Sequence, residues 1–302
     1  MSNPSFGKGI FFAFFAYFLW GSLPLYWRLL AAISPIHLLG FRVIVSLFSV
    51  SIVLLLAKNY SWLGFFKDRK TSLIMILASL LITLNWGLYV WAVNSGNTIQ
   101  TSLGYYINPL ITIILGLVFF REKLKILQII AFISAFIGVA VLTIFNGQLP
   151  WISLSLAFSF AAYSVLKKTV KLPALESLGA ETLIAFPIGI MLLFTTFGME
   201  GLEFTGPQGL YYITQLSGFT QFLILLIGLV SSLPLYLFAK GAKILPLSTL
   251  GFIQFVSPTM TFLTGLFIFR ESFPVRNFIA FGFIWGAAIL YIISLRLSSK
   301  QK

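Results

Sequence analysis

The sequence predicts an all-α, polytopic membrane protein whose ten transmembrane helices form two inverted five-helix repeats. Three observations predict this fold: an apolar composition, the spacing of the apolar stretches and an internal duplication. Of the 302 residues, 59% are hydrophobic and only 9% are charged. A chain of this composition cannot present a polar surface to water on every side, so it requires lipid as its solvent.

The apolar stretches are about 20 residues long, which is enough to cross roughly 30 Å of hydrocarbon. The first is too long for the core of a signal peptide, so we expect it to be retained as a helix. No segment between the stretches reaches the size of a domain. We expect ten helices, at residues 9–31, 35–57, 72–94, 99–120, 124–145, 149–168, 175–197, 218–242, 247–269 and 275–296.

The net charge of +13 follows the topology of these helices. If the N-terminus is cytoplasmic, sixteen Lys and Arg residues fall on the cytoplasmic side and three, Arg28, Arg270 and Arg276, on the other. This asymmetry obeys the positive-inside rule. We therefore expect a protein of the cytoplasmic (inner) membrane with both termini cytoplasmic, anionic membrane lipid as a partner and no nucleic acid as a partner.

The residue types needed for several other functions are missing. The chain has no cysteine, and its one histidine, His37, is expected at the surface. A disulfide or a histidine-based metal site is therefore excluded. A nucleophile paired with a base and a nucleotide-binding motif are also absent, so we expect neither an enzyme, nor a cofactor, nor ATP-driven transport.

The internal duplication divides the chain into repeats at 1–148 and 149–302. A proline is followed by an Arg-Glu pair whose glutamate lies 13 residues later in both copies, with a glycine 7 residues after the proline. The matching residues are Leu103, Gly104, Pro109, Gly116, Arg121 and Glu122 in the first copy and Leu250, Gly251, Pro258, Gly265, Arg270 and Glu271 in the second. Five spans is an odd number, so the second copy must enter the membrane from the opposite side.

Several short motifs resemble those of a known family. They are Leu19-Trp20-Gly21, the block from Asn85 to Asn94, the block from Ser102 to Leu110, Arg121-Glu122-Lys123-Leu124 and Gly147-Gln148-Leu149-Pro150-Trp151. With these motifs the chain resembles the drug/metabolite transporter superfamily, in particular its EamA family and the RarD-type permeases. The resemblance implies a ten-helix, two-repeat permease of the cytoplasmic membrane, and it implies no particular substrate.

Polar residues recur along one face of several expected helices. Thr101, Tyr105, Asn108 and Thr112 have the spacing of a single helical stripe. Because lipid cannot satisfy polar groups, such stripes face protein or water. We expect a substrate-binding cavity lined by Trp20, Asn85, Tyr89, Tyr105, Asn108, Thr112, Ser232, Tyr236, Gln254 and Ser257. The alternative is that these groups only bond neighbouring helices.

Two ionisable residues lie within expected helices and occupy aligned places in the two repeats. Arg42 is a candidate for attracting an anionic substrate group, and Glu181 for carrying a coupling proton. Either residue could instead be a structural charge, and their direct pairing is left open.

Three further features bear on movement and assembly. Pro109 and Pro258 are candidate hinges, because each removes a backbone donor, and static bends are the alternative. The Arg-Glu pairs are expected to cap the next helix of their own repeat, or else to form gates. The small residues of the fifth and tenth helices, with Gly282 and Gly286 among them, indicate a scaffold or the surface of a homodimer.

Together these features predict a secondary transporter that moves a small organic metabolite or drug-like solute by alternating access. A polar-pore channel or a facilitator without ion coupling is the alternative, because it would use the same polar stripes. A membrane enzyme is disfavoured by the missing catalytic set.

Overall fold

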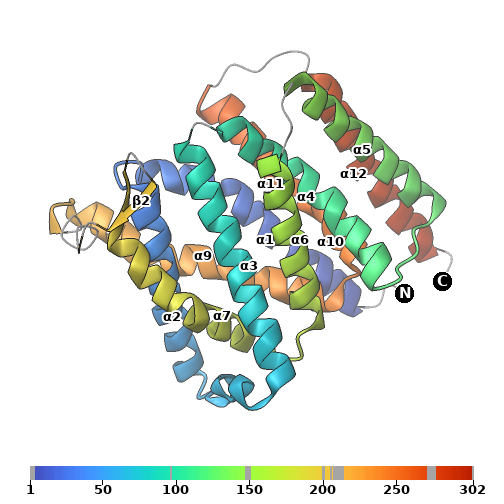
Figure 1. The fold of residues 1–302 in the computed structure, drawn as a ribbon. Coiled ribbons are helices and arrows are strands. Elements are labelled where there is room, and N and C mark those ends of the chain that lie inside the picture. Colours follow the sequence, from blue (N-terminus) through green and yellow to red (C-terminus); the bar gives the residue numbers. More distant parts are fainter. Residues whose placement is uncertain are drawn as a thin grey trace.

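The computed structural model of the chain describes residues 4–95, 97–146, 151–198, 201–204, 206, 214–270 and 277–300, and it is a helical bundle (Figure 1). The first half contains α1 (Pro4–Leu29), α2 (Pro35–Leu56), the 3-10 helix η1 (Ser61–Lys67), α3 (Arg69–Asn94), α4 (Thr98–Phe119) and α5 (Ile126–Asn146). The second half contains α6 (Trp151–Thr169), α7 (Ala174–Leu193), α9 (Gly218–Ile244), α10 (Leu247–Gln254), α11 (Val256–Leu263), the π-helix η2 (Thr264–Ile268) and α12 (Asn277–Lys300).

Each of the ten predicted spans corresponds to helix in the structure. Nine are single helices, whereas the ninth predicted span consists of α10, α11 and η2, with an interruption at Phe255. Within the described residues, nine of the ten segments are long and apolar enough to cross a membrane. The remaining one is α6, whose last turn carries Lys167 and Lys168.

A short β-hairpin was not predicted. Strands β1 (Thr195–Gly198) and β2 (Gly201–Phe204) pair antiparallel directly after α7, where the sequence suggested the end of a helix and a loop. His37 at the start of α2 shares a hydrogen bond with the carbonyl oxygen of Thr195, with 3.0 Å between Nε2 and the oxygen. The His37 side chain is also buried, so the prediction of a surface histidine was wrong.

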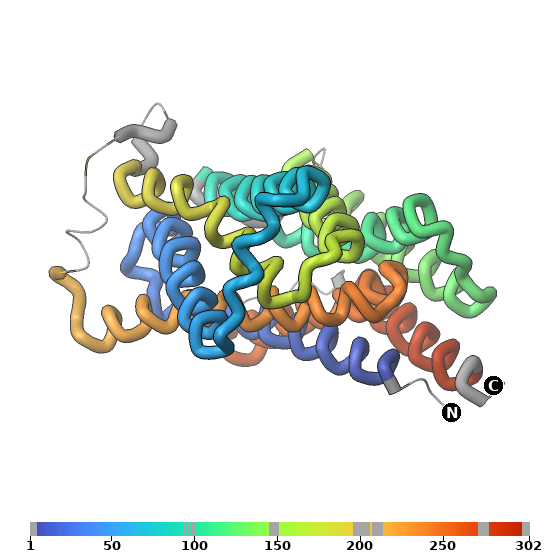
Figure 2. Tube along the Cα trace, turned by 90° about the horizontal axis from the view of Figure 1, so that it is seen from below, coloured from blue at the N-terminus to red at the C-terminus, as the bar shows by residue number. Residues whose placement is uncertain are grey.

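The bundle has two ends, which we name by what lies there. The termini face is the end where α1 begins and α12 ends, and Figure 2 shows both termini together there. The hairpin face is the opposite end, where α7 leads into β1. Because each span crosses once, α2 begins at the hairpin face, whereas its counterpart α7 begins at the termini face. This is the orientation expected of an inverted repeat.

Helix packing follows the same relation between the halves. Three contacts join corresponding helices: α2 packs on α7, α4 on α10, and α5 on α12. The first helix of each half packs into the other half, α1 against α9 and α11, and α6 against α3 and α4. Residue Gly251 permits the close approach of α10 to α4, since a Cβ there would lie 2.7 Å from the carbonyl oxygen of Pro109.

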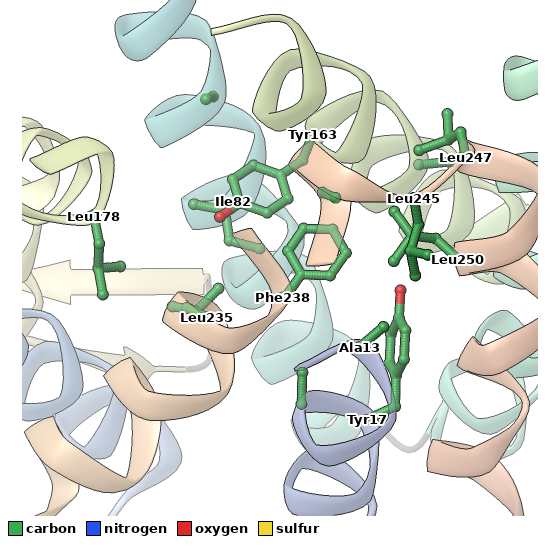
Figure 3. Close-up of a cluster of buried hydrophobic side chains, with 14 of the residues drawn as sticks. Ala13, Tyr17, Ile82, Tyr163, Leu178, Leu235, Phe238, Leu245, Leu247 and Leu250 are labelled. Carbon is green, nitrogen blue, oxygen red and sulfur yellow. The ribbon is translucent and has the colours of Figure 1, made fainter. Parts of the chain in front are cut away.

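The centre of the molecule is an aromatic and aliphatic core between α1, α6 and α9. The rings of Tyr163 and Phe238 stack at 5.9 Å between centroids, and Tyr17 of α1 approaches the same core (Figure 3). Trp20 belongs to this core, with its ring 5.6 Å from those of Phe160 and Phe238. Tight packing at this depth holds the first helix of each half against the other half.

At the edge of the bundle, α5 and α12 cover each other (Figure 1). Their small residues make this contact, since a Cβ on Gly138 would lie 2.7 Å from the Ala280 carbonyl oxygen. Ser134 also donates a hydrogen bond of 2.8 Å to the Phe283 carbonyl. Gly282 has open space around its Cα, so it does not mediate this packing.

Candidate functional site

An open cleft lies at the hairpin face, between the last turns of α1, the C-terminal half of α3 and the residue that follows η2. It has a volume of about 520 Å³ and is lined by Pro24, Trp27, Arg28, Tyr89 and Phe269. The Arg28 guanidinium carbon lies 4.4 Å from the centre of the Phe269 ring. The mouth of the cleft is thus formed by both halves of the chain and carries a positive charge.

Arg42 lies next to this cleft and is enclosed by aromatic rings. Its guanidinium carbon is 3.7 Å from the centre of the Trp86 ring and 5.9 Å from that of Trp27. The side chains of Tyr89 and Tyr105 lie near enough to the guanidinium to affect its electrostatics. Trp27 and Tyr89 therefore border both the cleft and Arg42.

No counter-charge accompanies Arg42 within the part of the chain that the structure describes. Its Nε atom is buried and has no hydrogen-bond partner there, and no described carboxylate forms an ion pair with the guanidinium. The contact with Trp86 compensates part of the cost of desolvating the cation. Arg42 as a whole is only partly buried, but a cation in a membrane-spanning helix without an anion is costly and is a candidate for a functional role.

Tyr89 and Tyr105 are the predicted cavity residues that remain accessible. Their ring centroids are 6.0 Å apart, and 37% and 46% of their surfaces are exposed, although both lie on helices of the bundle. The predicted stripe on α4 therefore faces accessible space at Tyr105. Further along α4, at Asn108 and Thr112, the stripe is buried.

Three other predicted residues form a buried polar cluster where α4 crosses α10. The Thr112 hydroxyl lies 3.2 Å from the Asn108 amide oxygen and 3.4 Å from the Gln254 amide oxygen. All three side chains are buried. The cluster bonds the first half of the chain to the second, which was the alternative interpretation of these stripes.

Asn85 also bonds helices together. Its amide nitrogen donates to the Leu156 carbonyl at 2.8 Å and to the Ser159 hydroxyl at 2.9 Å, which ties α3 to α6. Only one turn separates Asn85 from Tyr89, yet the two side chains meet different surroundings.

The remaining predicted lining residues lie away from the cleft. Trp20 packs in the aromatic core, and the Ser232 hydroxyl is buried without a partner among the described residues. The Tyr236 ring faces Lys240, whose Nζ is 4.6 Å from the ring centre. Ser257 contacts α1, since a Cβ on Gly21 would lie 2.6 Å from the Ser257 carbonyl oxygen.

The two predicted hinge prolines differ in their surroundings. Helix α4 continues through Pro109 as one element, whereas the corresponding span breaks at Phe255, three residues before Pro258. The second half is thus interrupted where the first is continuous.

Glu181 has a partner that the sequence did not reveal. Its carboxylate accepts a hydrogen bond from Lys167 Nζ at 2.7 Å and another from the Tyr163 hydroxyl at 3.0 Å. Lys167 also donates to the Ser177 hydroxyl at 2.5 Å. Lys167, counted above among the cytoplasmic lysines, is only 1% exposed. Arg42 and Glu181 do not pair, and each is the eighth residue of its helix, counted from opposite faces.

Glu122 caps a helix, but not the helix that we expected. Its carboxylate accepts hydrogen bonds from the backbone amides of Leu247 at 2.6 Å and Ser248 at 2.8 Å, at the start of α10. The expected helix was α5, the next in the same repeat. Glu122 follows Arg121, whose left-handed φ of 51° turns the chain toward the other half. Glu271, the repeat counterpart of Glu122, lies outside the described residues.

Lys168 makes hydrogen bonds within the second half at the same face. Its Nζ donates to the carbonyl of Leu245 and, at 3.4 Å, to that of Ala242, at the end of α9. At the termini face Glu122 thus hydrogen-bonds the first half to the second, whereas an open cleft lies at the hairpin face. Among the described residues no group of His, Asp and Glu side chains is arranged to hold a metal ion.

Comparisons with known proteins agree with one another. Residues 7–144 match the model of the EamA-like transporter family. The uncharacterized transporter YojE of Bacillus subtilis is 38% identical over 97% of this chain and 96% of its own length. Protein RarD of Streptomyces exfoliatus is 36% identical over 93% of this chain and 87% of its own. Protein RarD of Escherichia coli is 33% identical, with 95% and 94% covered. A solved crystal structure, 16% identical, has the same fold, with a TM-score of 0.71 over 95% of this chain and 98% of that one.

Proposed function

This chain belongs to the EamA-like transporter family, and we propose that it is a secondary transporter that moves a small organic solute across the cytoplasmic membrane by alternating access. That it is a multi-pass membrane transporter follows from its relatives and its apolar helices. The solute class, the mechanism and the orientation are our proposal. The charge asymmetry of the sequence supports an orientation with the termini face in the cytoplasm.

The observation that carries the mechanism is the difference between the two faces. A cleft of about 520 Å³ opens at the hairpin face, while Glu122 holds the first half to the second at the termini face. A carrier needs this arrangement, because its central site must be closed on one side whenever it is open on the other. A channel requires a route that is open on both sides at once.

In the proposed cycle, the solute enters the cleft from the hairpin face and contacts Tyr89 and Tyr105. Release of Glu122 from the amides of Leu247 and Ser248 then frees the second half to move relative to the first. Such release exposes charged and polar groups to water that can solvate them, so the cost of breaking the contact is moderate. The buried cluster of Asn108, Thr112 and Gln254 would act as the contact about which the halves rock.

Site-specific labelling tests the alternation, since the chain contains no cysteine. In a Tyr89→Cys variant, an impermeant maleimide should react from the hairpin face only. A second variant adds Glu122→Cys and Ser248→Cys, and a short cleavable crosslinker joins the thiols at positions 122 and 248. The crosslink should keep the reactivity at position 89 and stop solute flux, and flux should return when it is cleaved. Labelling of position 89 from the termini face while the crosslink is in place would contradict alternating access.

Flux in proteoliposomes separates the carrier from the alternative of a channel or an uncoupled facilitator. The solute that most raises the thermal stability of the purified protein is loaded on one side. A carrier should show a saturable flux that increases when unlabelled solute is present on the opposite side. A flux that rises linearly with concentration and lacks this stimulation would identify a channel.

A further inference from the structure

The cleft and Arg42 together form a site with a positive charge that no described residue neutralises. Arg42 lies in the membrane-spanning helix α2, with its Nε buried and without a hydrogen-bond partner among the described residues. Desolvating a cation is expensive unless an anion compensates it. Glu181, a carboxylate at the corresponding depth of the other half, is engaged by Lys167 and Tyr163.

Arg42 borders the cleft through two shared neighbours. Trp27 and Tyr89 line the cleft and also lie near the guanidinium, so an anion in the cleft would come close to the charge. A planar guanidinium binds a carboxylate through two parallel hydrogen bonds. The Tyr89 and Tyr105 side chains, which lie near the guanidinium, each carry a hydroxyl donor.

The rest of the cleft favours an apolar, planar body. Its walls contain the rings of Trp27, Tyr89 and Phe269, and Trp86 lies behind Arg42. Aromatic walls attract flat rings through stacked and edge-on contacts. Arg28 at the mouth adds a second positive charge that attracts anions from solution. A cleft of about 520 Å³ is of the size that holds a small organic molecule.

From this geometry we infer that the solute is a small organic anion with one carboxylate on a flat apolar body, and that Arg42 binds the carboxylate. This inference rests on the proposed function, because it names the class of solute that the transporter accepts. One carboxylate matches the Arg42 guanidinium, which can pair with it through two parallel hydrogen bonds.

Matched pairs of probes test the charge and the body separately. Phenylacetate and phenylacetamide have the same shape, but only the first is charged, and hexanoate with hexanamide adds a body that is not flat. Thermal stability of the purified full-length protein is measured against the concentration of each probe. We expect the carboxylates to bind at least about tenfold more tightly than their amides, with phenylacetate above hexanoate.

Variants of the protein test whether Arg42 causes the preference for carboxylates over amides. Arg42→Gln should bind phenylacetate and phenylacetamide equally, while Arg42→Lys should keep a reduced preference, since it retains the charge and loses the paired hydrogen bonds. Lys8→Gln removes a positive charge from the exposed start of α1 and should leave the preference unchanged. Should Arg42→Gln not fold, Tyr89→Phe serves in its place and should weaken binding of the carboxylate more than of the amide.

Two results would overturn the inference: equal binding of acids and amides by the wild type, or a full preference for the acids in Arg42→Gln. Because these measurements need no membrane, they are independent of the proposed function. If phenylacetate binds in an Arg42-dependent way but shows no flux in proteoliposomes, the binding site is supported and the transport of this class of solute is contradicted. Saturable flux of phenylacetate that is unchanged in Arg42→Gln would agree with the proposed transporter and contradict Arg42 as its binding site.

Discussion

Arg42 and Glu181 occupy corresponding places in the two halves, but their surroundings differ. Arg42 is eight residues into α2 from the hairpin face, next to an open cleft and without a described counter-charge. Glu181 is eight residues into α7 from the termini face, and its charge is balanced by Lys167. The neutralised charge thus lies toward the termini face, and the charge without a described partner lies toward the hairpin face. The repeat therefore determines where each charged side chain lies in the fold, and the residues around that side chain determine whether its charge is neutralised.

The largest expected effect comes from breaking the neutralised pair. Lys167→Met leaves the Glu181 carboxylate buried without its cation, so we expect a loss of about 3–5 kcal/mol in the free energy of unfolding. Arg42→Met removes a charge that has no described partner and should cost little or raise stability. Thermal unfolding in detergent measures both. The double variant Lys167→Met, Glu181→Leu should recover most of the loss, and a loss as large in Arg42→Met would mean that the two sites are equivalent.

The variant Glu181→Gln tests whether Glu181 couples transport to protons. The ion pair with Lys167 indicates a structural role, for which exchange and stability should fall together. A proton carrier would instead lose its response to a pH gradient while keeping solute exchange. Flux with and without a pH gradient in proteoliposomes, at equal protein abundance, decides between these two outcomes.

The second-largest effect concerns the closure of the termini face. Glu122→Ala removes an acceptor from two amides of α10, and we expect the closed state to lose about 2 kcal/mol, or roughly 30-fold in population. A cysteine at the buried position Thr112 should then react faster with a maleimide added at the termini face. Lys123→Ala, at the exposed neighbouring position, is the matched control. Unchanged reactivity at position 112 would show that Glu122 does not hold the face closed.

A smaller effect separates two side chains on α3. Asn85→Ala should lower stability by about 1 kcal/mol, because it removes hydrogen bonds to α6. Tyr89→Ala should leave stability nearly unchanged and weaken solute binding, since the Tyr89 ring lines the cleft. Thermal unfolding with and without phenylacetate measures the two effects together. Loss of stability with unchanged solute binding in Tyr89→Ala would contradict a solute site at Tyr89.

The smallest expected effect compares the two prolines. Pro258→Ala should slow solute exchange more than Pro109→Ala, because the span around Pro258 is already interrupted and the helix around Pro109 is continuous. Stopped-flow exchange in proteoliposomes measures the two rates. Equal slowing by both variants would indicate that neither proline is a hinge.

The sequence predicted the spans and their inversion well, because the length and polarity of each helix are local properties. It could not predict that Lys167 reaches Glu181, since a lysine near a helix end usually extends toward water. The spacing of Lys167 and Glu181 across the turn between α6 and α7 was the available signal, as it places both near one face.

The surroundings of the candidate cavity residues could not be predicted, for a similar reason. A stripe such as Tyr105 and Asn108 shows which side of a helix is polar, and only tertiary packing decides whether that side meets a cleft or another helix. Tyr89 and Tyr105 meet accessible space, whereas Asn108, Gln254 and Asn85 meet other helices. The expected target of Glu122 was wrong because helix order in the chain does not reveal that α10 begins beside it.

The interruption at Phe255 has a consequence for the timing of the cycle. The second copy has two more residues than the first between its glycine and its proline, Gly251 to Pro258 against Gly104 to Pro109. In a continuous helix, two extra residues would turn everything that follows by about 200°. Phe255 keeps right-handed helical torsions, so the interruption is a bend within the span, and the corresponding span of the first half has none. Opening at one side of the membrane is then not the mirror image of opening at the other, and the two half-reactions should have unequal rates even for a solute at equal concentration on both sides.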